Sequence, residues 1–288
     1  MPTREERQAD ARKNLALMRG AFAAETQAAI EAAHVYEDGE GRELALPEPA
    51  EGAVTTTSVT SDFAPKALRG AEGKTVIVDP CSFTRPGGGY EDGSFGPEQI
   101  LCAESNLYPA LQGCKGLYHD GNRGFASGQL FTDRALYLPN IAFVHDGDIR
   151  HADVLAIPEP NRARALENHR SEREVATALA TRIEALLRIA AANEVETLIV
   201  GAFGCGPQGF EPAVTIELFR TWIDAHPGAI GHIVFAVPRA SFAAFDEAFG
   251  STPEQPEPAP QTASEQHAED DEDDFDPNDL PEGITFRS

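Results

Sequence analysis

An acidic residue and an amide, Glu98 and Gln99, follow a run of three glycines at a short distance along the chain. A carboxyl group can hold a hydroxyl group or exchange a proton, and glycines let backbone N–H groups approach a ligand because no Cβ intervenes. If Pro97 occupies the first position of a helix, both side chains lie in its first turn and face whatever the glycine loop holds. The stretch therefore predicts a ligand site made by a loop and a helix start.

The elements on either side of the triplet would hold it in place. Residues 75–79 form a short β-branched run typical of a buried strand, and residues 100–111 carry apolar side chains at helical spacing. In the order strand, loop and helix, Gly87, Gly88 and Gly89 are expected to cradle a diphosphate with their backbone N–H groups.

A second glycine-rich loop, residues 201–206, also follows a strand-like run and precedes a helical pattern. Its candidate ligand contacts are Gly204, Cys205 and Gly206. Two such loops at strand ends indicate one extended ligand rather than two small ones.

These residues resemble the poly(ADP-ribose) glycohydrolases of microbial type. In that family a glycine triplet is followed, at the same spacing, by Gln-Glu-Glu, and Pro97-Glu98-Gln99 stands at those positions here. The resemblance covers roughly residues 20–250, since further similar segments occur in the same order: the tyrosine-bearing helix of residues 101–109, Phe131-Thr132-Asp133, and Gly204-Cys205-Gly206.

The resemblance implies a macrodomain, a three-layer α/β/α fold with a mixed sheet that binds ADP-ribose, or poly(ADP-ribose) on modified proteins. In the family the first glutamate holds ribose hydroxyls and the second acts as acid and base. Carried over, Glu98 takes the hydroxyl-holding role and Gln99 the catalytic position, and Phe210 is the aromatic residue that packs on the ligand. An amide cannot exchange a proton, so an ADP-ribose-binding protein with impaired or absent hydrolysis is expected. The dipole of the helix is expected to keep Glu98 ionised.

Two other functions stay open. Glu98 could itself supply acid and base, which would give an active ADP-ribose glycohydrolase, although it is displaced from the family's catalytic position. Cys205 could be the nucleophile of a cysteine hydrolase, but the sequence places no histidine to activate it.

Composition narrows the remaining classes. The chain has 288 residues and a net charge of −24, which disfavours direct binding to a nucleic-acid backbone. No apolar run approaches the roughly 18 residues that a membrane span needs, and the charged first residues are unlike a signal sequence, so a cytoplasmic protein is expected. Four scattered cysteines form no metal-binding or disulfide pattern, and neither a metal nor a cofactor is expected.

Three segments are expected along the chain. Residues 1–74 form an N-terminal helix and accessory strands packed on the core, residues 75–250 the macrodomain-like core, and residues 251–288 a disordered acidic tail. The tail could recruit a basic partner.

Several local expectations can be compared with the structure. Residues 4–33 are expected to form one long helix, and Pro139-Asn140 to split residues 136–144 into two strands or to mark an edge strand with a bulge. Ser171 and Glu174 form a capping box that opens a helix reaching Ala192. His119 lies in a glycine-rich loop and is expected to be a solvated side chain rather than a ligand contact.

Overall fold

The β-branched and aliphatic runs of the sequence form one seven-stranded sheet with the strand order β1-β4-β5-β3-β6-β7-β2. The computed structural model describes residues 2–145 and 147–250, which belong to one compact unit, Met1–Ser251. The predicted tail lies outside the described residues. The strands are β1 His34–Tyr36, β2 Thr56–Thr60, β3 Thr75–Asp79, β4 Ala135–His145, β5 Asp148–Ala156, β6 Thr197–Val200 and β7 His232–Ala236.

The sheet is mixed. Strands β5, β3, β6, β7 and β2 run parallel to one another, and β4 pairs antiparallel with both β1 and β5. All five residues of β3 are buried, because helices cover both faces of the sheet at its centre. Val76 and Val78 pack into one hydrophobic cluster and Ile77 into the other.

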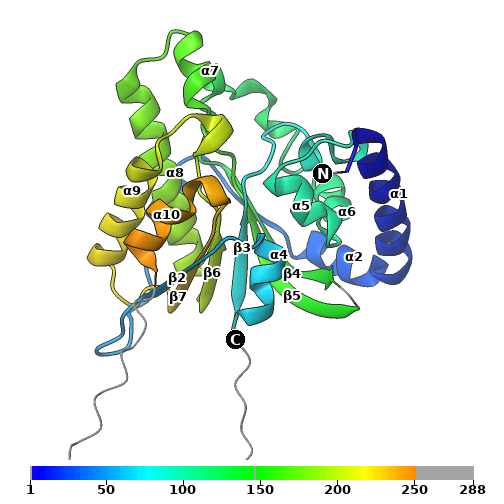
Figure 1. The fold of residues 1–288 in the computed structure, drawn as a ribbon, viewed down its shortest axis with the longest axis horizontal. Coiled ribbons are helices and arrows are strands. Elements are labelled where there is room, and N and C mark those ends of the chain that lie inside the picture. Colours follow the sequence, from blue (N-terminus) through cyan, green and yellow to red (C-terminus); the bar gives the residue numbers. More distant parts are fainter. Residues whose placement is uncertain (1, 146, 251–288) are drawn as a thin grey trace, which may run out of the picture. The chain divides into compact units, whose positions relative to one another are not determined.

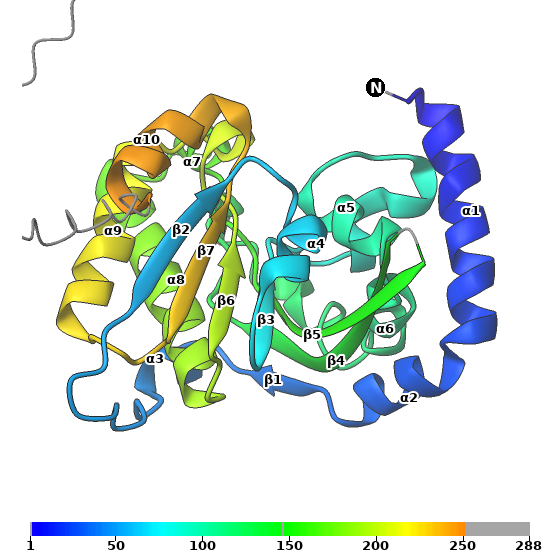
Figure 2. The same cartoon turned by 60° about the horizontal axis from the view of Figure 1, so that its bottom comes forward.

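Helices form the two outer layers (Figures 1 and 2). α8, α9 and α10 pack on one face, and α4, α5 and α6 on the other, with α1 outside them. This confirms the expected three-layer α/β/α fold. The helices are α1 Arg4–Ala21, α2 Ala23–Glu31, α3 Glu40–Glu43, α4 Ala64–Ala67, α5 Pro97–Ala103, α6 Leu107–Gly113, α7 Arg162–Glu167, α8 Glu172–Ala192, α9 Pro212–Ala225 and α10 Arg239–Phe249.

Two expected helices are each divided in two. The helix predicted over residues 4–33 breaks at Phe22, whose ring packs against Ala142 of β4. The helix predicted over residues 100–111 is interrupted because the chain between α5 and α6 pairs with β4: Asn106 N–H donates to the Ala142 carbonyl at 3.1 Å, and Ser105 bridges Phe143. Contacts with β4, packing in the first case and backbone pairing in the second, thus override the local helical spacing.

The strand expected around Pro139 is continuous but irregular. β4 carries the predicted bulge between Leu138 and Ile141, whereas the prediction that it is an edge strand is wrong. β1 pairs only with Ala135, Leu136 and Tyr137, so Pro139 lies beyond β1 and its missing N–H leaves no ladder partner unsatisfied.

The helix expected after Ser171 is confirmed as α8, with both hydrogen bonds of the capping box present. Its apolar face packs against the sheet, and its charged first turn remains at the surface. Among residues 2–145 and 147–250, none of the helices combines the length and the apolar character that crossing a bilayer requires.

Candidate functional site

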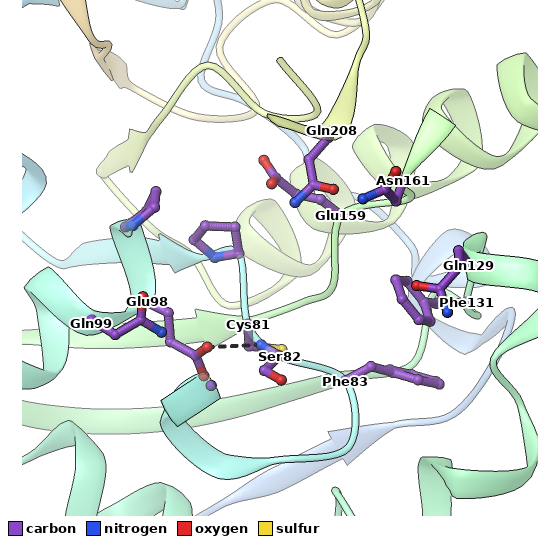
Figure 3. A pocket seen from close by; sticks show the side chains of 13 residues that line it. Cys81, Ser82, Phe83, Glu98, Gln99, Gln129, Phe131, Glu159, Asn161 and Gln208 are labelled. Atoms are coloured by element: carbon purple, nitrogen blue, oxygen red, sulfur yellow. Dashed lines mark hydrogen bonds between the residues drawn. The ribbon is translucent and has the colours of Figure 1, made fainter. Parts of the chain in front are cut away.

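A pocket of about 330 Å³ opens where β3 and β5 end, beside the glycine triplet (Figure 3). The segment after β3, the glycine loop, the start of α5 and the segment after β5 all contribute to it. We call it the main pocket; it is lined by Pro80, Cys81, Ser82, Phe83, Gly88, Pro97, Glu98, Gln99, Gln129, Phe131, Glu159, Asn161 and Gln208.

The glycine triplet forms a loop that only glycine adopts readily. Gly87, Gly88 and Gly89 have φ values of 66°, 56° and 101°, all in the left-handed region. A Cβ on Gly88 would lie 2.6 Å from Glu98 Oε2 and 2.8 Å from Gln99 Nε2. Of the three glycines, Gly88 lines the main pocket, while Cβ atoms on Gly87 and Gly89 would meet the ring of Tyr108 and the side chain of Ser94.

Pro97 begins α5 as expected, and this places both predicted side chains in the main pocket. Gln99 Nε2 donates to the Gly87 carbonyl at 3.0 Å, which ties the helix start to the glycine loop. Glu98 is 4% exposed, and its Oε2 accepts a hydrogen bond from the Ser82 N–H at 3.0 Å. Glu98 Oε1 is buried and has no hydrogen-bond partner among the described residues.

The expectation that Glu98 is held ionised is wrong. Burial raises the pKa of Glu98 well above its ordinary value, and the nearby Asp79 carboxyl raises it further. The helix behind Glu98 is only seven residues long, and its dipole is outweighed by the loss of solvation. Glu98 therefore holds a proton at a higher pH than an ordinary glutamate, and can donate as well as accept a hydrogen bond.

Two further carboxyl groups at this edge of the sheet were not predicted. Asp79 ends β3, is fully buried, and neither carboxyl oxygen has a hydrogen-bond partner within the described ranges. Burial raises the pKa of Asp79 to about 8, with a second contribution from Glu159. Burial likewise raises the pKa of Glu159, after β5, to about 7. An acidic residue at the carboxyl end of a central strand is the signal that could have identified Asp79.

The second glycine loop contributes less to the main pocket than expected. Gly204 N–H donates to Glu159 Oε1 at 2.7 Å, so this donor supports a pocket side chain. Gly206 starts a short 3-10 helix, Gly206–Gln208, and it is Gln208 that reaches the main pocket. Phe210 is 6% exposed and packs in the hydrophobic core, where it contributes to the wall behind the loop.

Cys205 lies in surroundings that suppress a nucleophile. Its Sγ is buried and lies 3.6 Å from Thr215 Oγ1, and burial raises the pKa of the thiol. A reactive cysteine needs a lowered pKa and an adjacent base. The surroundings of Cys205 therefore do not support the alternative function of a cysteine hydrolase.

Arg182 of α8 connects two of the segments that line the main pocket, the one after β5 and the one around Leu130. The guanidinium is 1% exposed; its Nη1 donates to the Pro158 carbonyl and its Nη2 to the Leu130 carbonyl, the latter at 3.1 Å. These carbonyls stand next to pocket-lining residues on two different segments. Burial lowers the pKa of Arg182 to about 10, which leaves it charged at neutral pH.

His119 differs from its expected placement. The ring is fully buried, packs edge-on against Tyr118 at 5.0 Å between centroids, and has no hydrogen-bond partner among the residues that the structure describes. Burial lowers the pKa of His119 to about 4. It is not among the residues that line the main pocket, so it is a core residue.

The pKa of Asp79 predicts how stability depends on pH. Because its folded pKa lies above the unfolded value of 3.8, the folded state binds the extra proton, and stability is lost as pH rises through the range from about 4 to 8. Relative to Asp79→Asn, the free energy of unfolding of the unmodified protein should fall by about 1 kcal/mol per pH unit between pH 5 and 8. Urea denaturation of both proteins at several pH values measures this difference.

The comparison with Asp79→Asn also removes an opposing effect. The lowered pKa of His119 makes stability rise with pH between about 4 and 6.5, but it does so in both proteins and cancels. Parallel stability curves for the two proteins would contradict an elevated pKa at Asp79.

Comparison with known proteins shows which family this chain is similar to. The model of the microbial-type PARG catalytic domain, where PARG is poly(ADP-ribose) glycohydrolase, matches residues 11–146. No curated protein matches the chain. Among solved structures, PARG from Thermomonospora curvata is 25% identical with a TM-score of 0.74, covering 85% of this chain and all of that one.

Two similar structures contain ligands. PARG from Thermomonospora curvata bound to the inhibitor ADP-HPD is 26% identical with a TM-score of 0.73, covering 85% of this chain and 100% of that chain. PARG from Deinococcus radiodurans in complex with ADP-ribose is 27% identical with a TM-score of 0.68, covering 77% of this chain and 96% of that chain. The match of residues 11–146 to the family model, the three-layer fold and the glycine loop beside Glu98 make the chain similar to the microbial-type poly(ADP-ribose) glycohydrolases in sequence, fold and site.

Proposed function

We propose that this protein binds ADP-ribose in the main pocket and is impaired or inactive as a glycohydrolase. The observation that carries the proposal is the pairing of Glu98 and Gln99 against the glycine loop, in a chain whose solved relatives include an ADP-ribose complex. Gly88 lines the main pocket, and its lack of a Cβ lets the side chains of Glu98 and Gln99 lie directly against the loop backbone.

In this proposal Glu98 holds a ribose hydroxyl through Oε1, the buried oxygen that lacks a partner. A buried polar atom without a hydrogen bond costs free energy, and a ligand hydroxyl would supply the missing bond. Gln99 stands where the family's acid and base acts, but its amide is engaged with the Gly87 carbonyl and has no proton to exchange at neutral pH. The substitution keeps the shape of the site while removing its acid.

Isothermal titration calorimetry tests the binding directly. We expect saturable heat with ADP-ribose at micromolar to submillimolar concentration, and a loss of about tenfold or more in affinity for Glu98→Ala, because a hydrogen bond to a buried carboxyl group is removed. Glu104→Ala, on a side chain paired with His145 outside the main pocket, is a matched control and should leave the affinity unchanged. Absence of heat at millimolar ADP-ribose would contradict the proposal.

A second candidate is an active glycohydrolase that uses Glu98 as its acid. The raised pKa of Glu98 favours it, because a glutamate that keeps its proton near neutral pH can protonate a leaving oxygen. Turnover of poly(ADP-ribose) distinguishes the binding protein from the active glycohydrolase. Turnover of poly(ADP-ribose) by the unmodified protein that disappears in Glu98→Gln supports the second.

A further inference from the structure

Glu159 lines the main pocket from the segment after β5, and its carboxyl group is bonded to the second glycine loop. Its Oε1 accepts a hydrogen bond from the Gly204 N–H at 2.7 Å. Gly204 itself is buried and is not among the residues that line the main pocket. The carboxyl group therefore stands between the pocket and a backbone donor of the loop that the sequence predicted to contact the ligand.

Most N–H groups of the second glycine loop bond to carbonyls of the same loop. These are the N–H groups of Phe203, Cys205, Gln208, Gly209 and Phe210. Pro207 has no N–H. The Gly204 N–H differs from them because it donates out of the loop, to the Glu159 side chain. It is a donor that a ligand can use once that side chain has moved away.

The Glu159 carboxylate resembles a bound anion in its placement. Backbone N–H groups of glycine loops bind phosphate oxygens, and a carboxylate oxygen takes the same place in such a site. Burial raises the pKa of Glu159 to about 7, and the hydrogen bond from Gly204 opposes this shift because it stabilises the ionised form. Above neutral pH the loop therefore holds an anion that belongs to the protein itself.

The main pocket offers a diphosphate no side-chain cation to balance its charge. Two carboxyl groups, Glu98 and Glu159, line it, and its described lining contains no lysine, arginine or histidine. The buried carboxyl group of Asp79 lies near both. A phosphate beside an ionised Glu159 would be repelled, so backbone N–H groups are the donors that can hold it.

The backbone of Glu159 is fixed, but its side chain has only to rotate. A proline precedes it and another follows it, and the Pro158 carbonyl accepts a hydrogen bond from the buried Arg182. Figure 3 shows the side chains of Glu159 and Gln208 together at one side of the main pocket, apart from Glu98. Releasing the Gly204 N–H therefore requires a change of one side chain and no displacement of the segment.

We propose that Glu159 is a specificity-determining residue that occupies the position of one phosphate of ADP-ribose, so that the ligand must displace this carboxylate from the Gly204 N–H. The inference rests on the proposed function of the main pocket and deepens it, because it assigns the diphosphate to a particular backbone donor. The carboxylate acts as an internal competitor and lowers the affinity for ADP-ribose below the value that the loop alone would give.

Calorimetry with ADP-ribose at pH 8, using the full-length protein, tests the displacement. Glu159→Gln should bind ADP-ribose about tenfold more tightly than the unmodified protein, because the amide keeps the shape of the side chain and lacks the charge that competes with a phosphate. Glu159→Ala, which also removes the hydrogen-bond acceptor, should gain at least as much. Melting temperatures verify that both variants fold.

Glu196→Gln is the matched control. Glu196 Oε1 likewise accepts a hydrogen bond from a backbone N–H, that of Lys74 at 3.0 Å, but it lies beside the start of β3, whereas the main pocket opens where β3 ends. The variant removes one negative charge from the chain and should leave the affinity unchanged. An equal gain in Glu196→Gln would mean that net charge causes the effect, and it would overturn the proposal.

A crystal structure of the unmodified protein with ADP-ribose supplies a second measurement. We expect a phosphate oxygen within hydrogen-bond distance of the Gly204 N–H, and the Glu159 carboxyl group turned away from it. A complex in which Glu159 keeps this bond, or equal affinities of the unmodified protein and Glu159→Gln, would also overturn the proposal. Failure of the main-pocket proposal gives a different result, because then ADP-ribose produces no heat with any of the four proteins.

Discussion

Replacing Gln99 by glutamate is expected to raise the rate of ADP-ribose release from poly(ADP-ribose) by about a hundred- to ten-thousand-fold, the usual contribution of general acid and base assistance. The side chain already lies in the main pocket beside Glu98, and glutamate is nearly isosteric with glutamine. Release of ADP-ribose from automodified polymer, measured for both proteins side by side, gives the ratio. Binding of ADP-ribose should survive in both.

The hydrogen bond that Gln99 makes implies that the rate gained by Gln99→Glu depends on pH. Nε2 donates to the Gly87 carbonyl at 3.0 Å, and a carboxylate in that place would face the carbonyl with like partial charge. Only the protonated acid keeps the bond, so the pKa of the introduced glutamate is raised and the gain in rate should decline at alkaline pH. Gln27→Glu, the same exchange on α2, is the control and should not change the rate. A gain from Gln27→Glu, or brisk turnover by the unmodified protein, would contradict the assignment of Gln99.

Replacing Gly88 by alanine should reduce ADP-ribose affinity by about a hundredfold and stability by about 1 to 3 kcal/mol. The added Cβ would lie within 2.8 Å of both Glu98 and Gln99, and the φ of 56° is unfavourable for alanine. Either the two side chains or the loop must shift, and both belong to the main pocket. Calorimetry and urea denaturation measure the two effects.

Gly116 supplies the matched control for Gly88. It is exposed, has no left-handed φ, and a Cβ placed on it meets nothing within 4 Å. Gly116→Ala should therefore leave both affinity and stability close to the original values. If Gly88→Ala behaved like Gly116→Ala, the loop would not be the cradle that we propose.

Sequence patterns correctly predicted the parts of the site that are formed by residues close together along the chain. The glycine triplet, the helix start at Pro97 and the capping box of α8 all involve residues a few positions apart, and each is present in the structure. The strands that precede the two glycine loops, β3 and β6, were identified for the same reason. Glu98 and Gln99 were found because they belong to this local pattern.

The remaining features depend on what packs against a residue from far along the chain. The buried state of Asp79 and the raised pKa of Glu98 arise from desolvation, which no local pattern encodes. The break between α5 and α6 arises from pairing with β4, and His119 is buried by neighbours that the glycine-rich loop did not reveal. Arg182, in the middle of α8, looks like a surface charge until the fold places two carbonyls beside it.

The guanidinium of Arg182 makes the two walls of the main pocket a single cooperative unit. One side chain donates to carbonyls of both the segment before Glu159 and the segment between Gln129 and Phe131, and the Asn161 N–H joins the same two segments again. Neither wall can move outward without breaking hydrogen bonds that also anchor the other, and the guanidinium that makes them is 1% exposed. We therefore expect the two segments to detach from α8 together, so that their amides exchange with solvent at one shared free energy.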